Sequence, residues 1–177
     1  MMIRLASKVQ KDSIVDGPGL RTVIWTQGCK HACPGCHNPQ THNINGGFEM
    51  KVDDVIEEIR SARLQKGVTL SGGEPFLQSV ALEKIAAESK KLGLDIWSYT
   101  GFRFEWLIDK RNPSVEDNLK LLQHIDVLVD GKFMMNKKDY RLKFRGSSNQ
   151  RIIDVQKSLE EGTVVLSPYN DYDKHDC

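Results

Sequence analysis

Three cysteines are crowded into eight residues and form a C-x3-C-x2-C pattern at Cys29, Cys33 and Cys36. Glycines before and within this motif allow sharp turns, so the three thiolates can point together toward one small object. Thiolates suit iron–sulfur clusters and zinc. In a four-iron cluster, three cysteine ligands leave one iron open for a substrate or cofactor, as an open position marks a catalytic zinc. The spacing therefore predicts metal chemistry.

A structural zinc ion is the alternative metal for the same cysteines. In that case His31, His37 or His42 would complete a Cys3His set. Zinc motifs more often come as two separated cysteine pairs, and this sequence has no second pair. The remaining cysteine, Cys177, ends a polar segment, and we expect a free, exposed thiol there.

A second motif, Ser-Gly-Gly-Glu-Pro at residues 71–75, follows a short apolar run. Without a Cβ, Gly72 and Gly73 allow the backbone to approach a ligand closely. The same residues would also suit a tight strand-to-helix turn, with Pro75 in the first helical position and Glu74 favoured by the helix dipole. Both interpretations can hold at once. The presence of the cysteine motif favours the interpretation in which the Gly-Gly backbone contacts a bound ligand.

Elements that would position these motifs alternate between strand and helix. Residues 52–63 carry apolar side chains at i, i+3, i+4 and i+7, which predicts an amphipathic helix. The main strands are predicted at 21–26, 68–70, 94–99 and 125–130, and residues 3–9 are a candidate partner beside the first of them. Residues 152–153 and 164–166 are later strand candidates. Further helices are predicted around 82–86, 103–110 and 115–123. Such alternation is typical of an α/β fold with a parallel sheet. At 177 residues the chain is too short for a full eight-fold barrel unless the barrel is cut down. With the family resemblance given below, the expected fold is a truncated (partial) TIM-like barrel of parallel strands with outer helices.

In parallel α/β folds the ligand lies at the carboxyl ends of the strands. The cysteine loop, the Gly-Gly turn, Thr100 and the segment Asp130–Lys132 all follow predicted strands. We therefore expect them to line one rim. A single domain over residues 1–177 is expected, with 168–177 as a loose polar tail.

Charge and hydropathy exclude several kinds of partner. Lys and Arg number 25 against 24 Asp and Glu, so the net charge of +1 gives no reason to expect nucleic acid or an anionic membrane. No apolar run approaches the ~20 residues that span a bilayer, and the start lacks the apolar stretch of a secretory signal. The expected compartment is the cytoplasm.

The motifs together resemble a known family. The cysteine motif after one strand and Ser-Gly-Gly-Glu-Pro after the next resemble the radical S-adenosylmethionine (SAM) superfamily. Val-Asp-Gly-Pro-Gly-Leu-Arg-Thr at 15–22 and Cys-Pro-Gly-Cys-His-Asn-Pro at 33–39 resemble glycyl-radical-enzyme activases. The small size, Asp-Gly-Lys-Phe at 130–133 and Gly-Ser-Ser-Asn-Gln-Arg at 146–151 resemble the activases of anaerobic ribonucleoside-triphosphate reductase. The resemblance covers roughly residues 10 to 160, and His42 stands near a position where an aromatic residue is expected.

The resemblance implies a [4Fe–4S] cluster on Cys29, Cys33 and Cys36, with SAM bound at the open iron. Reductive cleavage of SAM would yield a 5′-deoxyadenosyl radical, which takes hydrogen from a glycine of the large reductase subunit. A reduced flavodoxin or ferredoxin-type protein is the implied electron donor. The protein would supply orientation and the exclusion of water and oxygen.

The resemblance, together with positions beside the last cysteine or at predicted strand ends, indicates the cofactor-binding residues, which are Gly35, Cys36, His37, Gly72, Gly73, Glu74, Thr100, Asp130 and Lys132. Backbone carbonyls of the Gly-Gly pair would accept from the SAM ammonium, so Gly73→Val is expected to weaken SAM binding more than cluster assembly. Gly35 and His37 would contact the adenine. Asp130 and Lys132 would hold ribose or the SAM carboxylate, the alternative being a surface salt bridge.

Two other functions are weighed against this one. One is activation of another glycyl radical enzyme of the pyruvate formate-lyase type, whose activases are usually longer. The other is a zinc-stabilised binding module without catalysis. The basic residues between Lys132 and Arg151 could dock an acidic partner or form a solvated face, and Asp16–Gly19 could border the entry of the target glycine or form only a turn.

Overall fold

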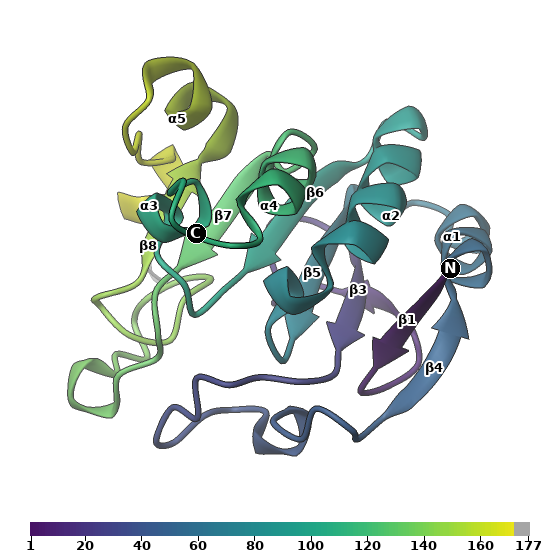
Figure 1. Ribbon diagram of the computed structural model, residues 1–177, viewed down its shortest axis with the longest axis horizontal. Helices are drawn as coiled ribbons and strands as arrows, with labels where there is room; N and C mark the ends of the chain where they lie inside the picture. Colours follow the sequence, from purple (N-terminus) through teal and green to yellow (C-terminus); the bar gives the residue numbers. More distant parts are fainter. Residues whose placement is uncertain (172–177) are drawn as a thin grey trace.

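The computed structural model describes residues 1–171 and is built on one open sheet (Figure 1). The strand order is β4-β1-β3-β5-β6-β7-β8, and β2 also pairs with β3. The strands are β1 (Met2–Leu5), β2 (Gln10–Ser13), β3 (Arg21–Thr26), β4 (Phe48–Lys51), β5 (Gly67–Gly72), β6 (Asp95–Tyr99), β7 (Val127–Asp130) and β8 (Arg151–Asp154).

Four central strands, β3, β5, β6 and β7, run parallel to one another. The expectation of a parallel sheet is confirmed for this core. It is wrong for the edges, where β1, β2, β4 and β8 all pair antiparallel. Within residues 1–171 the two edge strands β4 and β8 do not pair with each other, so the sheet does not close into a barrel.

Helices α1, α2 and α4 lie side by side over one face of the sheet (Figure 1). They bury the predicted apolar stripes, such as Val52, Val55, Ile56 and Ile59 on α1, against strand residues including Ile24 and Leu70. The helices are α1 (Val52–Ser61), α2 (Ser79–Lys91), α3 (Phe104–Leu107), α4 (Val115–Leu122) and α5 (Val155–Glu161), with short 3-10 turns η1 (Pro39–Thr41), η2 (Pro75–Gln78), η3 (Met135–Lys137) and η4 (Pro168–Asp171). The outer helices expected from the sequence are therefore present.

The opposite face of the sheet carries a small aromatic cluster. Trp97 of β6 packs edge-on against Phe144 and Tyr169, each with ring centroids 5.3 Å away. Tyr169 belongs to η4, so residues 168–171 pack on the sheet and are not the loose tail that their polar composition predicts. Cys177 lies outside the described residues.

Three elements were not predicted from the sequence. Strands β2 and β4 are only four residues long and largely exposed, β2 is polar throughout, and the four residues of β4 are too few for their alternation to indicate a strand. Helix α5 does carry local signals, because the Asp154 side chain accepts from the Lys157 amide at its start and Gly162 ends it with φ 70°. Among residues 1–171 we find no helix with the length and apolarity needed to cross a membrane.

Candidate metal and cofactor site

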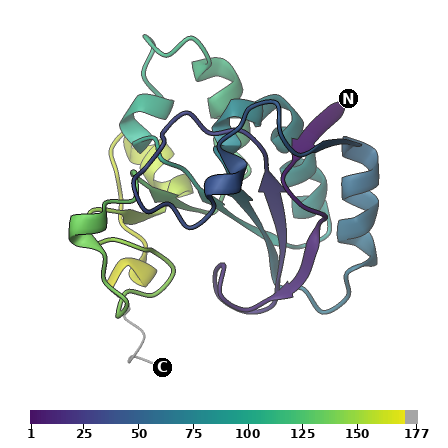
Figure 2. The same ribbon diagram turned by 90° about the horizontal axis from the view of Figure 1, so that it is seen from below.

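The cysteine loop runs across the carboxyl ends of the central strands (Figure 2). Its two ends are joined by backbone hydrogen bonds, from the Gly28 amide to the Thr41 oxygen at 2.8 Å and from the Cys29 amide to the His42 oxygen at 3.2 Å. The Glu74 amide donates to the Gly28 oxygen at 2.8 Å, which ties the loop to the end of β5. Backbone geometry thus holds the loop on the sheet.

A cavity of about 610 Å³ opens beside this loop. Its wall contains all three motif cysteines and residues from the ends of three further strands, as the rim hypothesis predicts. The predicted site residues that line it are Cys29, Cys33, Cys36, His37, Gly72, Gly73, Thr100 and Lys132. Gly35, Glu74 and Asp130 are not among its lining residues.

The three thiols are free and partly exposed, which suits them to ligate a cluster. The Cys36 sulfur accepts a hydrogen bond from the Asn38 amide at 3.4 Å, an interaction that tunes thiolate ligands of iron–sulfur clusters. Burial raises the pKa of the Cys29 thiol, the backbone amide of His31 opposes this by hydrogen bonding, and the nearby Glu74 carboxylate raises it further. Metal ligation would offset that increase, because a bound cation favours the thiolate.

A single zinc ion is not supported by the side-chain positions. Within residues 1–171, no three His, Cys, Asp or Glu side chains converge as ligands of one ion. The His31 ring nitrogen Nε2 lies 2.6 Å from Glu74 Oε2, and the His37 ring packs against Phe133 at 5.1 Å. In a four-iron cluster each thiolate binds a different iron, so three cysteines lining one cavity fit the cluster better than zinc.

The Gly-Gly pair is required by close backbone contact. A Cβ on Gly72, whose φ is 104°, would overlap backbone atoms of Thr26. A Cβ on Gly73 would overlap the backbone oxygen of Gly28, directly before Cys29. The expectation that Gly73→Val acts mainly on SAM binding is therefore revised, because the added side chain would push first against the cysteine loop.

Glu74 is placed differently from expectation. Its side chain is only 1% exposed, and both oxygens accept from protein groups, Phe76 and Thr100 on one side and Gly101 and His31 on the other. The carboxylate is thus engaged beneath the cavity wall and does not face a ligand. The side chain of Thr100 donates to Glu74 Oε1 at 2.9 Å while the residue lines the cavity.

Asp130 is likewise engaged inside the protein. It is fully buried and accepts from Arg151 at 2.9 and 2.5 Å and from the Phe104 amide at 2.8 Å. It therefore forms a buried salt bridge and is not available to ribose, which corrects the predicted ligand role. Lys132, two residues on, is exposed and lines the cavity.

The wall facing the cysteines comes from the loop between β7 and β8. The Gln150 side chain accepts from the Gly146 and Ser147 amides at 2.9 and 3.1 Å and donates to the Gly131 oxygen at 3.1 Å. Arg145 donates to the Gln150 oxygen at 2.6 Å. The Gly-Ser-Ser-Asn-Gln-Arg motif thus holds this loop in shape by side-chain hydrogen bonds.

The sequence did not indicate that aromatic and apolar residues of this loop, and of the segment before the Asp-Gly-Pro-Gly turn, form part of the cavity wall. Among the lining residues are Phe133, Phe144, Ile14 and Val15. Ile14 and Val15 are 71% and 72% exposed, and only their position before the Asp-Gly-Pro-Gly turn hints at a place on the rim. Asp16 also lines the cavity, as the rim interpretation of Asp16–Gly19 predicts.

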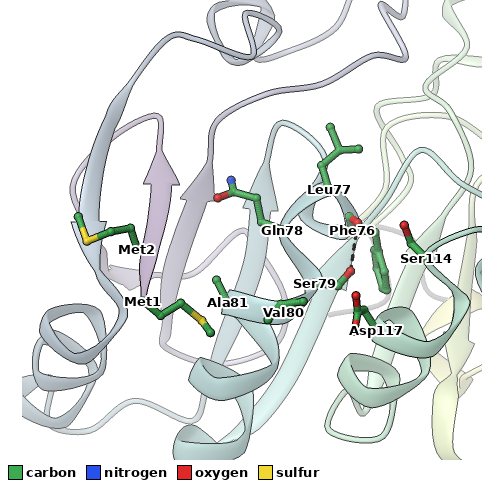
Figure 3. Close-up of a pocket in the computed structure, with 10 residues that line it drawn as sticks. All are labelled: Met1, Met2, Phe76, Leu77, Gln78, Ser79, Val80, Ala81, Ser114 and Asp117. Atoms are coloured by element: carbon green, nitrogen blue, oxygen red, sulfur yellow. Dashed lines mark hydrogen bonds between the residues drawn. The ribbon is translucent and has the colours of Figure 1, made fainter.

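A smaller cavity of about 280 Å³ lies away from the cysteines, between the N-terminus and the first residues of α2 and α4 (Figure 3). Its lining is mainly apolar, including Met1, Phe76 and Val80, with Asp117 as the one carboxylate among its described lining residues. It brings together no constellation that could do chemistry, and the cavity beside the cysteines is the candidate site.

Comparison with known proteins finds both a family model and several relatives. A family model described as a 4Fe-4S single cluster domain matches residues 15–153. The anaerobic ribonucleoside-triphosphate reductase-activating protein of Salmonella typhi is 40% identical over 147 residues, covering 77% of this chain and 90% of that protein. The proteins of the same name from Escherichia coli (strain K12), 39% identical over 147 residues, and Enterobacteria phage T4, 34% identical over 145 residues, cover 77% and 78% of this chain and 90% and 86% of their own length.

Proposed function

Since the chain belongs to the family of anaerobic ribonucleoside-triphosphate reductase-activating proteins, with a 4Fe-4S single cluster domain, we propose that it is the enzyme that generates the glycyl radical of an anaerobic ribonucleoside-triphosphate reductase. Membership of the radical SAM superfamily, and with it a truncated barrel, is part of this proposal. The observation that carries it is the single cavity that collects three free thiols and the Gly-Gly backbone at the ends of parallel strands.

In this proposal Cys29, Cys33 and Cys36 hold the [4Fe–4S] cluster. When bound, the cluster and SAM supply a one-electron cleavage that yields a 5′-deoxyadenosyl radical. Gly72 and Gly73 contribute backbone at the cavity wall, where their carbonyls can accept from the SAM ammonium. His37 flanks the last cysteine and packs on Phe133, which provides a flat surface for an adenine ring.

The remaining wall would admit the target polypeptide and limit water. Lys132 presents an ammonium to the cavity, suited to a carboxylate of SAM, and the loop of residues 131–150 faces the cysteines across the cavity. Asp16, Ile14 and Val15 border the same cavity and would meet the entering segment of the reductase. A reduced flavodoxin or ferredoxin-type protein as electron donor and a cytoplasmic location stay predictions.

The test begins with iron and acid-labile sulfide after anaerobic reconstitution. About four irons per chain are expected, with a reduced-state paramagnetic spectrum that SAM perturbs. Mixing the reduced protein with SAM and the large subunit of an anaerobic ribonucleotide reductase should then produce a glycyl radical signal. Stoichiometric zinc without iron uptake, or radical formation on pyruvate formate-lyase alone, would contradict the proposal.

Single cysteine variants sharpen the ligand assignment. Replacing Cys29, Cys33 or Cys36 with Ala should abolish SAM cleavage, because each thiolate binds a separate iron. The matched control is Cys177→Ala, which should retain full iron content and cleavage. Retained cleavage in any of the three loop variants would remove that cysteine from the ligand set.

A further inference from the structure

Glu74 is a meeting point of three chain segments. Its Oε1 accepts from the Phe76 amide at 3.1 Å and from the Thr100 hydroxyl at 2.9 Å. Its Oε2 accepts from the Gly101 amide at 2.9 Å and lies 2.6 Å from His31 Nε2. These partners come from η2, from the end of β6 and from the cysteine loop. A buried carboxylate with four partners is strongly held in one position.

His31 connects this carboxylate to a cluster ligand. Its side chain is 9% exposed, and its ring packs edge-on against Phe102 at 4.5 Å. Its backbone also acts on Cys29, where it partly opposes the burial that raises the pKa of that thiol. One residue of the loop therefore has its ring fixed by Glu74 and its backbone beside a motif cysteine.

Close packing around the ring leaves it little freedom. A Cβ on Gly101 would overlap the His31 ring, so the backbone at the end of β6 presses directly against the imidazole. The pair thus joins the cysteine loop to the strand end that carries Thr100 in the cavity wall.

We propose that Glu74 and His31 form a buried clamp that fixes the cysteine loop against the ends of β5 and β6, and that both are positioning residues for the cluster and its cofactor. The inference rests on the proposed cluster at the three cysteines. It assigns the Glu74 side chain to the loop and not to the cofactor, and it gives the histidine of the motif a role other than metal ligation. Partners that orient metal ligands from behind typically change metal affinity or activity about 10–100-fold when removed.

The first experiment separates hydrogen bonding from packing at residue 31. His31→Leu keeps apolar contact with Phe102 but loses the bond to Glu74, whereas His31→Gln places an amide donor at similar reach. We expect His31→Leu to lose iron to a chelator about 10-fold faster than the unmodified protein and to show an altered spectral response to SAM. His31→Gln should restore most of both properties. A leucine variant that matches the unmodified protein, or a glutamine variant no better than leucine, would overturn the clamp.

The second experiment changes two other residues of the clamp, Glu74 and Gly101. Glu74→Gln retains the shape but cannot accept from all four partners, and Gly101→Ala pushes on the ring without removing any hydrogen-bonding group. Both should accelerate iron loss in the same direction as His31→Leu. The matched control is Glu83→Gln, which breaks the His124–Glu83 contact at 3.3 Å, where both side chains are about 30% exposed. This control should leave iron retention unchanged.

The outcomes distinguish the clamp from the proposed function. If the unmodified protein takes up no iron, the cluster assignment itself fails. If it loads iron and responds to SAM but Glu74→Gln and Gly101→Ala retain iron equally well, only the clamp fails. Far-ultraviolet circular dichroism and the unfolding midpoint of each iron-free variant provide the folding check, and a variant that unfolds is replaced by the next member of the set.

Discussion

The two walls of the cavity are held in different ways. The cysteine wall is held mainly by the backbone, beside the buried Glu74–His31 pair: Gly28 and Cys29 bond to Thr41 and His42, and Gly73 lies so close to Gly28 that no side chain fits between them. The facing wall, residues 131–150, is held by side chains, above all those of Gln150 and Arg145. Just behind it, Arg151 bonds to Asp130.

This difference determines which kinds of substitution should disrupt each wall. A wall held mainly by backbone contacts is most sensitive to added volume, and polar substitutions act on it only through the few side chains that it uses, here Glu74 and His31. A wall held by buried charges and amides is sensitive to the loss of a partner, because a group left unpaired away from water is strongly unfavourable. Outside the Glu74–His31 pair, the cysteine wall should therefore be disrupted by steric substitutions, and the facing wall by deletions of polar groups.

The largest effect is expected for Gly73→Val. Its side chain would overlap the backbone of Gly28 and displace the residue before Cys29. Iron incorporation should fall by about 10-fold or more, together with SAM binding, since loop and cofactor wall move together. Iron and sulfide analysis after reconstitution measures the first, and equilibrium dialysis with labelled SAM the second.

The control for this variant is Gly162→Val. That glycine has a positive φ of 70°, which Gly73 does not, but a Cβ there meets nothing within 4 Å. It should lower stability without changing iron content. Normal iron loading in Gly73→Val would break the distinction between the two walls.

A smaller effect, on stability alone, is expected for Arg151→Met. The change removes the partner of the fully buried Asp130 while keeping a long apolar stem. The free energy of unfolding of the iron-free chain should fall by about 3 kcal/mol, measured by denaturant titration. Cluster content at low denaturant should stay normal, because Arg151 lies behind the facing wall. Loss of iron at unchanged stability would contradict this division.

The matched control is Arg111→Met. Arg111 pairs with Asp109 at 2.6 Å, but its side chain is 83% exposed. Solvent and salt screen such a pair, so no measurable loss of stability is expected.

The smallest effect concerns pH. Hydrogen bonding to Arg151 lowers the pKa of Glu105 from 4.5 to about 2. A carboxyl group with a lowered pKa stabilises the fold above its unfolded value and loses that contribution as pH falls from about 4.5 toward 2. Glu105→Gln should therefore be slightly less stable than the unmodified protein at pH 7, with the gap closing over that range. Because Glu105 is 58% exposed, screening keeps the gap small. A gap that widens on acidification would contradict the assignment to this ion pair.

Residues whose roles depend on local backbone could be predicted from the sequence. Strand β3 was predicted with its observed ends, Arg21–Thr26, and the stripe of α1 was placed within two residues of its end. The cysteines and Gly72–Gly73 reach the same cavity because parallel strands end at one edge.

Residues whose partners are distant in sequence could not be assigned in this way. Asp130 meets Arg151 only because β8 turns back antiparallel beside β7 in register. Glu74 meets His31 across 43 residues, and neither periodicity nor composition contains that contact. Tyr169 packs on Trp97, a residue far away in the sequence, and the polar composition around Tyr169 does not indicate that contact.

The closed base of the cysteine loop has a further consequence for maturation. Backbone bonds join residues 28 and 29 to 41 and 42, so the ends of the loop are brought together by folding itself. Folding of the chain has then already offset the entropic cost of closing the loop before any metal binds. The loop should accordingly be formed before the cofactor assembles. Delivery of iron and sulfide, and not reorganisation of the polypeptide, should then limit the rate of assembly.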